Sequence, residues 1–299
     1  MQTLYALESM ETAANNPSPD KILKNKLEET RKLFTYLVFF LTEVARYAEI
    51  DARNRSSKHL PSQEDLNVNT KIAGNESLWK ILEAPGFKAN VDQFHFSEII
   101  ETELVKKLYL ELAETEHYKE YIESSSREKK PERKILESIF SEIMLPNADF
   151  IHHIEEHFIN WDDDAELMET LVLGYLTKPQ QNAFLEMLSQ EKWEYAQSLL
   201  KTVIDKNEHT LELIKPKLKN WDADRIASLD LIILHLGLCE LLYFETIPTK
   251  VTINEYIDIA KAYSTPQSGQ FINGLLDNLN KELTAANKIH KKVFKNSTL

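Results

Sequence analysis

The chain has 299 residues, of which 42% are hydrophobic, so it can bury a sizeable core in one large or two ordinary domains. Six glycines are few for this length, and charged and apolar residues alternate at helical spacing, which argues against sheet-rich folds. The net charge of −13 lies wholly in residues 1–190, which hold 21 Lys and Arg against 34 Asp and Glu. Binding of nucleic acid would therefore need a local basic patch.

Helical spacing predicts an all-α chain with few long loops. Residues 1–12 form a predicted helix that begins without an N-cap, and residues 33–41 are the most apolar window before the last third of the chain. Nine residues are far fewer than the roughly 20 that a membrane span needs, so we expect a buried helix and no membrane contact. The other expected elements are helices over 21–50, from about 76 to before Pro85, over 97–122 and over 134–145, a surface loop over 51–74 and a solvated linker over 124–133.

Residues 134–173 resemble residues 194–233 at an offset of 60. The clearest match is Asn160-Trp161-Asp162-x-Asp164, which returns as Asn220-Trp221-Asp222-x-Asp224. The pattern indicates either a partial duplication of a helix pair or two helices that begin with similar caps, since Asp suits a helix N-terminus. For the same reason, we expect Asp162 to Asp164 to cap a helix and not to bind a cation.

The last third of the chain contains the expected core. Residues 226–244 form an almost wholly apolar helix, and Pro216 before it marks a helix start or a kink. After an Ile-Pro turn, Thr252 with Glu255 fits a capping box, and Pro266 fits the first position of the final helix. The single cysteine, Cys239, lies within the apolar helix, so no intrachain disulfide is possible; with no signal peptide visible, we expect a cytoplasmic protein.

Candidate catalytic and metal-binding residues all have simpler interpretations. His153 and His157 lie one helical turn apart, but Ile154 stands where a metalloprotease needs Glu and no third ligand is obvious, so a solvated helical face is favoured. His235 lies in the apolar helix and fits a buried, hydrogen-bonded histidine. Phosphate-binding and nucleophile motifs are absent from the sequence. We therefore predict no enzyme activity, no catalytic residue, no metal site and no cofactor.

Three residues of the apolar helix predict a surface for a protein partner. Asp230 stands near its start, where an acid can also simply serve the helix dipole. Gly237 lies seven residues later on roughly the same face. Glycine inside a helix costs up to ~1 kcal/mol against alanine, which suggests close approach by another backbone or side chain. Glu240 borders the same face. The expected partner-binding residues are Asp230, Gly237 and Glu240.

The stretch from Cys239 to Leu279, CELLYFETIPTKVTINEYIDIAKAYSTPQSGQFINGLLDNL, resembles the NusB family of transcription antitermination factors. It parallels the family's YEL, its VP-x-KV-x-INE run and its S-x-K-F-V-N-G-V-L-D signature, and residues 1–8, MQTLYALE, parallel the first-helix motif VQALY. The resemblance covers about 115 residues in two blocks and implies an all-helical fold of two small bundles. It divides the chain into the first core helix (1–14), an acidic helical extension (15–190) and the remaining core (191–299).

The resemblance also implies a function. The family binds the boxA element of nascent RNA together with a ribosomal protein, NusE, and helps RNA polymerase to resist termination on ribosomal RNA operons. By position, the implied RNA-binding residues are Gln2, Tyr5, Lys250, Ser268, Gln270 and Phe271. Gln270 departs from the family's basic residue, and the family's arginine-rich segment would precede Met1, so we expect that Met1 is internal to a longer natural chain. The alternative is a protein-binding helical scaffold with little RNA affinity. An rRNA methyltransferase, a third function known for proteins with NusB-like domains, is not expected, because no methyl-donor fold follows residue 299.

Overall fold

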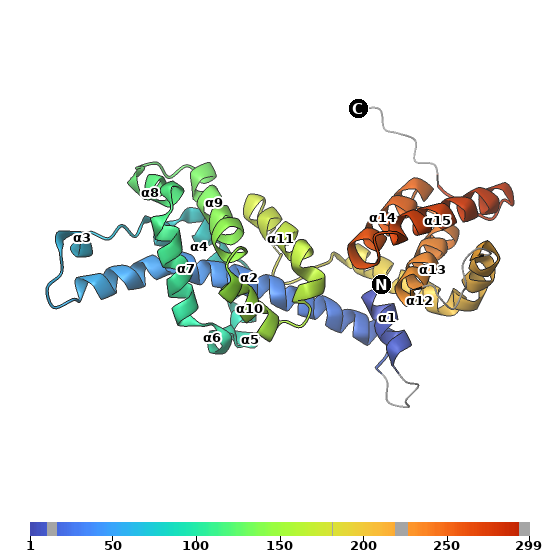
Figure 1. Ribbon diagram of the computed structural model, residues 1–299, viewed down its shortest axis with the longest axis horizontal. Coiled ribbons are helices and arrows are strands. Elements are labelled where there is room, and N and C mark those ends of the chain that lie inside the picture. Colours follow the sequence, from blue (N-terminus) through green and yellow to red (C-terminus); the bar gives the residue numbers. More distant parts are fainter. Residues whose placement is uncertain (11–16, 181, 219–226, 293–299) are drawn as a thin grey trace. The chain divides into compact units, whose positions relative to one another are not determined.

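The computed structural model describes residues 1–10, 17–180, 182–218 and 227–292, and within these ranges every regular element is helical (Figure 1). The prediction of an all-α fold is confirmed. The chain divides into two compact units. One, here the split unit, combines Met1–Lys26 with Leu188–Leu299, and the other, the inserted unit, is Leu27–Met187. None of the described helices is long and apolar enough to cross a bilayer.

The split unit is a helical bundle built around α13. It contains α1 (Gln2–Ser9), the first turns of α2 (Pro19–Ser56), α12 (Gln190–Ile214), the short 3₁₀ helix η3 (Lys215–Leu218), α13 (Ser228–Tyr243), α14 (Thr249–Tyr263) and α15 (Ser268–Ala285). Helices α1, α12, α14 and α15 all pack against α13. This central position explains why α13 is apolar on every side, as the sequence predicted. Pro216 lies in η3, where the chain leaves α12.

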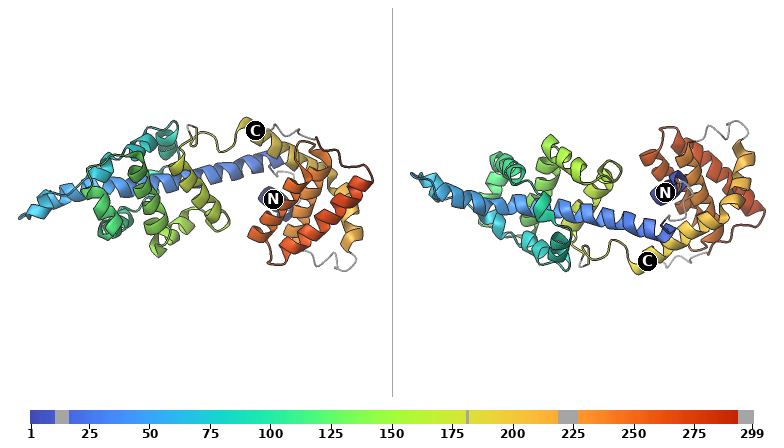
Figure 2. Two further views of the ribbon diagram at one scale, coloured as in Figure 1. Left: turned by 90° about the horizontal axis from the view of Figure 1, so that it is seen from above. Right: turned by 90° about the horizontal axis from the view of Figure 1, so that it is seen from below.

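The inserted unit is organised around the rest of α2, which runs through it as one long helix (Figures 1 and 2). Residues 33–48 of this helix are mostly buried. Tyr36 and Phe40 lie at the centre of an aromatic cluster with Phe96, Phe150 and Phe158. The helices around it are α3 (Gln63–Leu66), η1 (Lys71–Gly74), α4 (Glu76–Leu82), α5 (Phe87–Gln93), α6 (Phe96–Ile99), α7 (Thr102–Glu114), α8 (Glu116–Glu123), α9 (Lys129–Ser138), the π-helical η2 (Ile139–Met144), α10 (Ala148–His157) and α11 (Trp161–Thr177).

Several element boundaries in the inserted unit differ from the prediction. The expected loop over 51–74 is partly helical, because α2 continues to Ser56 and α3 and η1 follow. The expected helix over 97–122 is three helices, and the Thr115 side chain caps α8 by accepting from Tyr118 N. The expected linker over 124–133 contains the start of α9. There Glu132 is fully buried, accepting hydrogen bonds from Tyr121 Oη at 3.0 Å and from Glu76 N at 2.8 Å.

The predicted starts of three helices, α14, α15 and α11, also differ from the structure. Helix α14 begins at Thr249 after Pro248, so Thr252 is not a cap; it is buried inside the helix. Pro266 lies in the turn before α15 and not at its first position. Asn160, not Asp162, occupies the N-cap position of α11, and Asp162 to Asp164 fill its first turn. The second copy of this motif, at 220–224, lies outside the described residues.

Candidate functional site

The predicted RNA-binding residues come from three helices of the split unit. Gln2 and Tyr5 lie on α1, where Tyr5 is half exposed. Lys250 is exposed in the first turn of α14, and Gln270 is exposed in the first turn of α15 beside the partly buried Phe271. These side chains therefore offer two aromatic rings, one cation and two amides to a ligand.

The packing of α14 on α15 separates Lys250 from Gln270. Gly269, next to Gln270, lies against Lys261 near the C-terminal end of α14, where a Cβ on the glycine would meet Lys261 Cγ at 2.9 Å. Lys250 is eleven residues earlier on α14, about 16 Å along the helix at 1.5 Å per residue. The structure thus brings Gln270 and Phe271 together and places Lys250 at the other end of the helix pair.

Gln270 and Phe271 line a surface groove of about 520 Å³ along α15. Lys217 of η3 reaches the same groove and forms an ion pair with Glu282. No sequence pattern indicated Lys217, whose position depends on the packing of η3. The α15 residues of the groove have a sequence signal, because they recur at helical spacing on both sides of Gln270. The full lining is Lys217, Gln267, Gln270, Phe271, Gly274, Leu275 and Asn278.

Ser268, also predicted to bind RNA, is only 2% exposed and belongs to a buried polar cluster. Its hydroxyl donates to Asp230 Oδ2 at 2.8 Å, and the Ser264 hydroxyl donates to Asp230 Oδ1 at 2.6 Å. Both carboxylate oxygens of Asp230 are therefore bound within the chain. The cluster ties the start of α13 to the turn between α14 and α15, and so positions the first turn of α15 that carries Gln270 and Phe271.

The other predicted partner-binding residues are buried as well. A Cβ on Gly237 would lie 2.9 Å from Leu276 Cδ1 and 3.2 Å from Tyr256 Cδ2, so the close approach inferred from the sequence is made by the chain itself. Glu240 accepts a hydrogen bond from Tyr195 Oη at 3.0 Å, and burial raises its pKa. Direct contact of Asp230, Gly237 or Glu240 with a partner stays a prediction; in this structure all three hold the bundle together.

For the histidines, the prediction of a buried, hydrogen-bonded His235 is confirmed, and the prediction of a solvated face at His153 is wrong. His235 is buried, its Nδ1 lies 2.5 Å from Thr210 Oγ1, and burial lowers its pKa, which favours the neutral ring. His153 does not lie on a solvated face: it is 2% exposed, and its Nε2 lies 2.5 Å from Tyr36 Oη. His157 Nδ1 turns to the carbonyl oxygen of His153, at 2.9 Å. No three metal-binding side chains come together within the described ranges.

Comparison with known proteins finds similarity that begins at the end of the inserted unit and runs through most of the split unit. The NusB family model matches residues 156–281. Transcription antitermination proteins NusB are similar over a third of this chain: the protein of Methylacidiphilum infernorum is 44% identical over 95 residues, that of Salinibacter ruber 38% over 98 and that of Natranaerobius thermophilus 37% over 105. The chain spans 66%, 61% and 73% of the length of these relatives. No solved structure matches it.

Proposed function

Because the chain belongs to the NusB family, we propose that it is a transcription antitermination or termination factor that acts in the cytoplasm. It would bind a boxA-like single-stranded RNA together with the ribosomal protein NusE, and would reach the RNA polymerase elongation complex through them. The observation that carries the proposal is the similarity of about a hundred residues to proteins named for antitermination.

The groove along α15 supports an RNA contact at its Gln270 and Phe271 end. Single-stranded RNA is held by base stacking on aromatic rings and by phosphate contacts. Phe271 supplies a ring in this groove, and Tyr5 on α1 offers a second ring outside it. The only cation that lines this groove in the described structure is Lys217, which already pairs with Glu282. Each phosphate contact to single strands contributes about −0.7 to the salt slope of log K, so few contacts mean weak binding by this chain alone.

The test measures fluorescence anisotropy of a labelled boxA-like RNA with the full chain, with and without NusE. We expect weak binding alone and tighter binding with NusE. Phe271→Ala should weaken binding about five- to hundredfold, as expected for the loss of one stacked base. Gln270→Lys should strengthen it and make the salt slope steeper. Absence of binding at low salt, with NusE and without it, would overturn the proposal.

A second candidate, a protein-binding scaffold with little RNA affinity, is favoured by one observation. The inserted unit holds 18 Lys and Arg against 31 Asp and Glu, whereas the remainder of the chain holds 17 of each. An acidic surface of this kind fits a basic protein partner. Recovery of ribosomal or polymerase proteins after nuclease treatment, without measurable RNA binding, would support the scaffold over the RNA-binding factor.

A further inference from the structure

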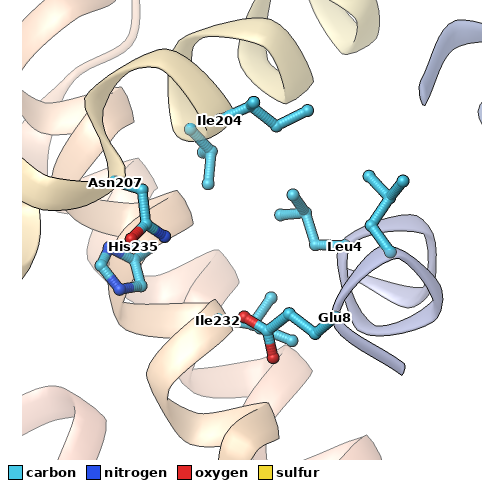
Figure 3. Close-up of a pocket in the computed structure, with 8 residues that line it drawn as sticks. Leu4, Glu8, Ile204, Asn207, Ile232 and His235 are labelled. Carbon is cyan, nitrogen blue, oxygen red and sulfur yellow. The ribbon is translucent and has the colours of Figure 1, made fainter. Parts of the chain in front are cut away.

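A second groove of the split unit lies between α1, α12 and α13, and none of its residues belongs to the predicted RNA contacts. It encloses about 240 Å³. Figure 3 shows Leu4 facing Ile204 and Ile232 across the opening, with Asn207 and His235 on the far side. The full lining is Leu4, Leu7, Glu8, Val203, Ile204, Asn207, Ile232 and His235. Five of these eight side chains are aliphatic, so the groove is mainly apolar.

The polar groups of this groove exclude phosphate and favour a cation. No lysine or arginine lines it, and its one charged side chain is Glu8, which makes no ion pair with any described residue. Partial burial raises the pKa of Glu8, as expected for a carboxylate with no cation beside it. Burial also disfavours a charged His235, whose Nδ1 faces Thr210. An RNA backbone would therefore meet a carboxylate and find no positive charge.

The size of the groove points to a protein side chain and not to a free small molecule. Its volume is below the roughly 300 Å³ at which typical ligand pockets begin, but it can accept one large aliphatic or aromatic side chain. Ile204, at the rim, leaves 41% of its surface exposed. Such an apolar slot with a polar rim is typical of the anchor points of helix-in-groove complexes.

We propose that this groove docks a segment of a protein partner that places one large apolar side chain between α1 and α12 and a lysine or arginine against Glu8. The charges on α12 support this occupant. Glu208 follows Ile204 by four residues, so it lies on the same face of the helix, and no described cation pairs with it. Lys201 precedes Ile204 by three residues and marks the opposite end. The basic group of the partner should therefore lie towards Glu8 and Glu208.

The test uses methyl-labelled full-length protein and a helical alanine-based peptide of about twelve residues with one phenylalanine and a lysine four positions away. We expect the peptide to shift the methyl resonances of the groove, those of Leu4, Leu7, Val203, Ile204 and Ile232. A peptide with glutamate in place of lysine should bind more weakly, by about two- to fivefold, as expected for one exposed ion pair.

Matched variants separate docking from folding. Ile204→Ser should weaken peptide binding about tenfold, because the rim loses its apolar side chain. Val251→Ser removes a similarly exposed apolar side chain outside the groove and should leave binding unchanged. Glu8→Gln should abolish the preference for lysine over glutamate. Shifts that are absent at millimolar peptide, that spread over the whole chain, or that a short single-stranded RNA produces instead would overturn the proposal.

Discussion

Gly237 and Gly274 offer a matched pair for testing the packing of the split unit. Both are interior helical glycines, on α13 and α15. A Cβ at Gly237 would stand 2.9 Å from the fully buried Leu276 and 3.2 Å from the ring of Tyr256, whereas a Cβ at Gly274 would meet nothing within 4 Å. We expect Gly237→Ala to be neutral or destabilising and Gly274→Ala to be stabilising.

The magnitudes follow from two effects. Alanine gains about 1 kcal/mol over glycine in the middle of a helix, and both variants share this gain. Gly237→Ala also adds a methyl group to a filled core, which costs about 1–3 kcal/mol. The helix term cancels in the comparison, so the free energies of unfolding of the two variants should differ by about 1–3 kcal/mol, the steric cost alone.

Native-state hydrogen exchange of amides in α13 and α15 measures the free energy of opening of the split unit. Amides of α7, in the inserted unit, serve as the internal control and should not respond to either variant. Equal stabilisation by both substitutions would refute the reasoning, because it would mean that α15 and α14 do not approach α13 at Gly237 as closely as the structure has them.

Three further outcomes are expected. Ser268→Ala should destabilise the split unit by about 1.5–3 kcal/mol in urea unfolding, because the buried Asp230 carboxylate loses a charged hydrogen bond. Thr252→Val should stabilise it by about 1 kcal/mol in the same assay, because Thr252 Oγ1 is buried and makes no hydrogen bond with the described residues. Burial lowers the pKa of His153 and His235, so below pH 6.5 the unfolded chain binds more protons; the melting temperature should fall from pH 7 to pH 5, and less so in His153→Gln and His235→Gln variants.

Local sequence patterns were enough to predict the central helix α13 and a close contact at Gly237. The apolar run of α13 predicted a central helix, because only a helix surrounded by others is apolar on every side. The glycine at position 237 predicted a close approach, because glycine is costly inside a helix. The neighbour could not be predicted in the same way, since Leu276 and Tyr256 come from other helices.

Errors arose where a long-range contact overrides a local pattern. His153 and His157 have the spacing of a solvated face, but Tyr36, 117 residues earlier in the chain, binds His153 in the core. Thr252 has the sequence context of a cap, but α14 begins three residues earlier and buries it. In the candidate site, Gln270 and Phe271 follow from the motif, whereas Lys217 does not, because it reaches the groove only through the packing of η3.

The uneven distribution of charge between the two units predicts two opposing effects of salt concentration on RNA binding. If the split unit, which is neutral in sum and has few cations in its α15 groove, binds RNA as proposed, its affinity should rise as salt falls. The charge of −13 on the inserted unit then acts over a longer range, since the Debye length grows from about 8 Å at physiological salt to about 30 Å at 0.01 M. Repulsion of RNA and attraction of a basic protein increase together. If a basic ribosomal protein binds this chain as proposed, it would therefore do more than add a contact: by covering negative charge, it would reduce the repulsion that opposes the proposed binding of RNA.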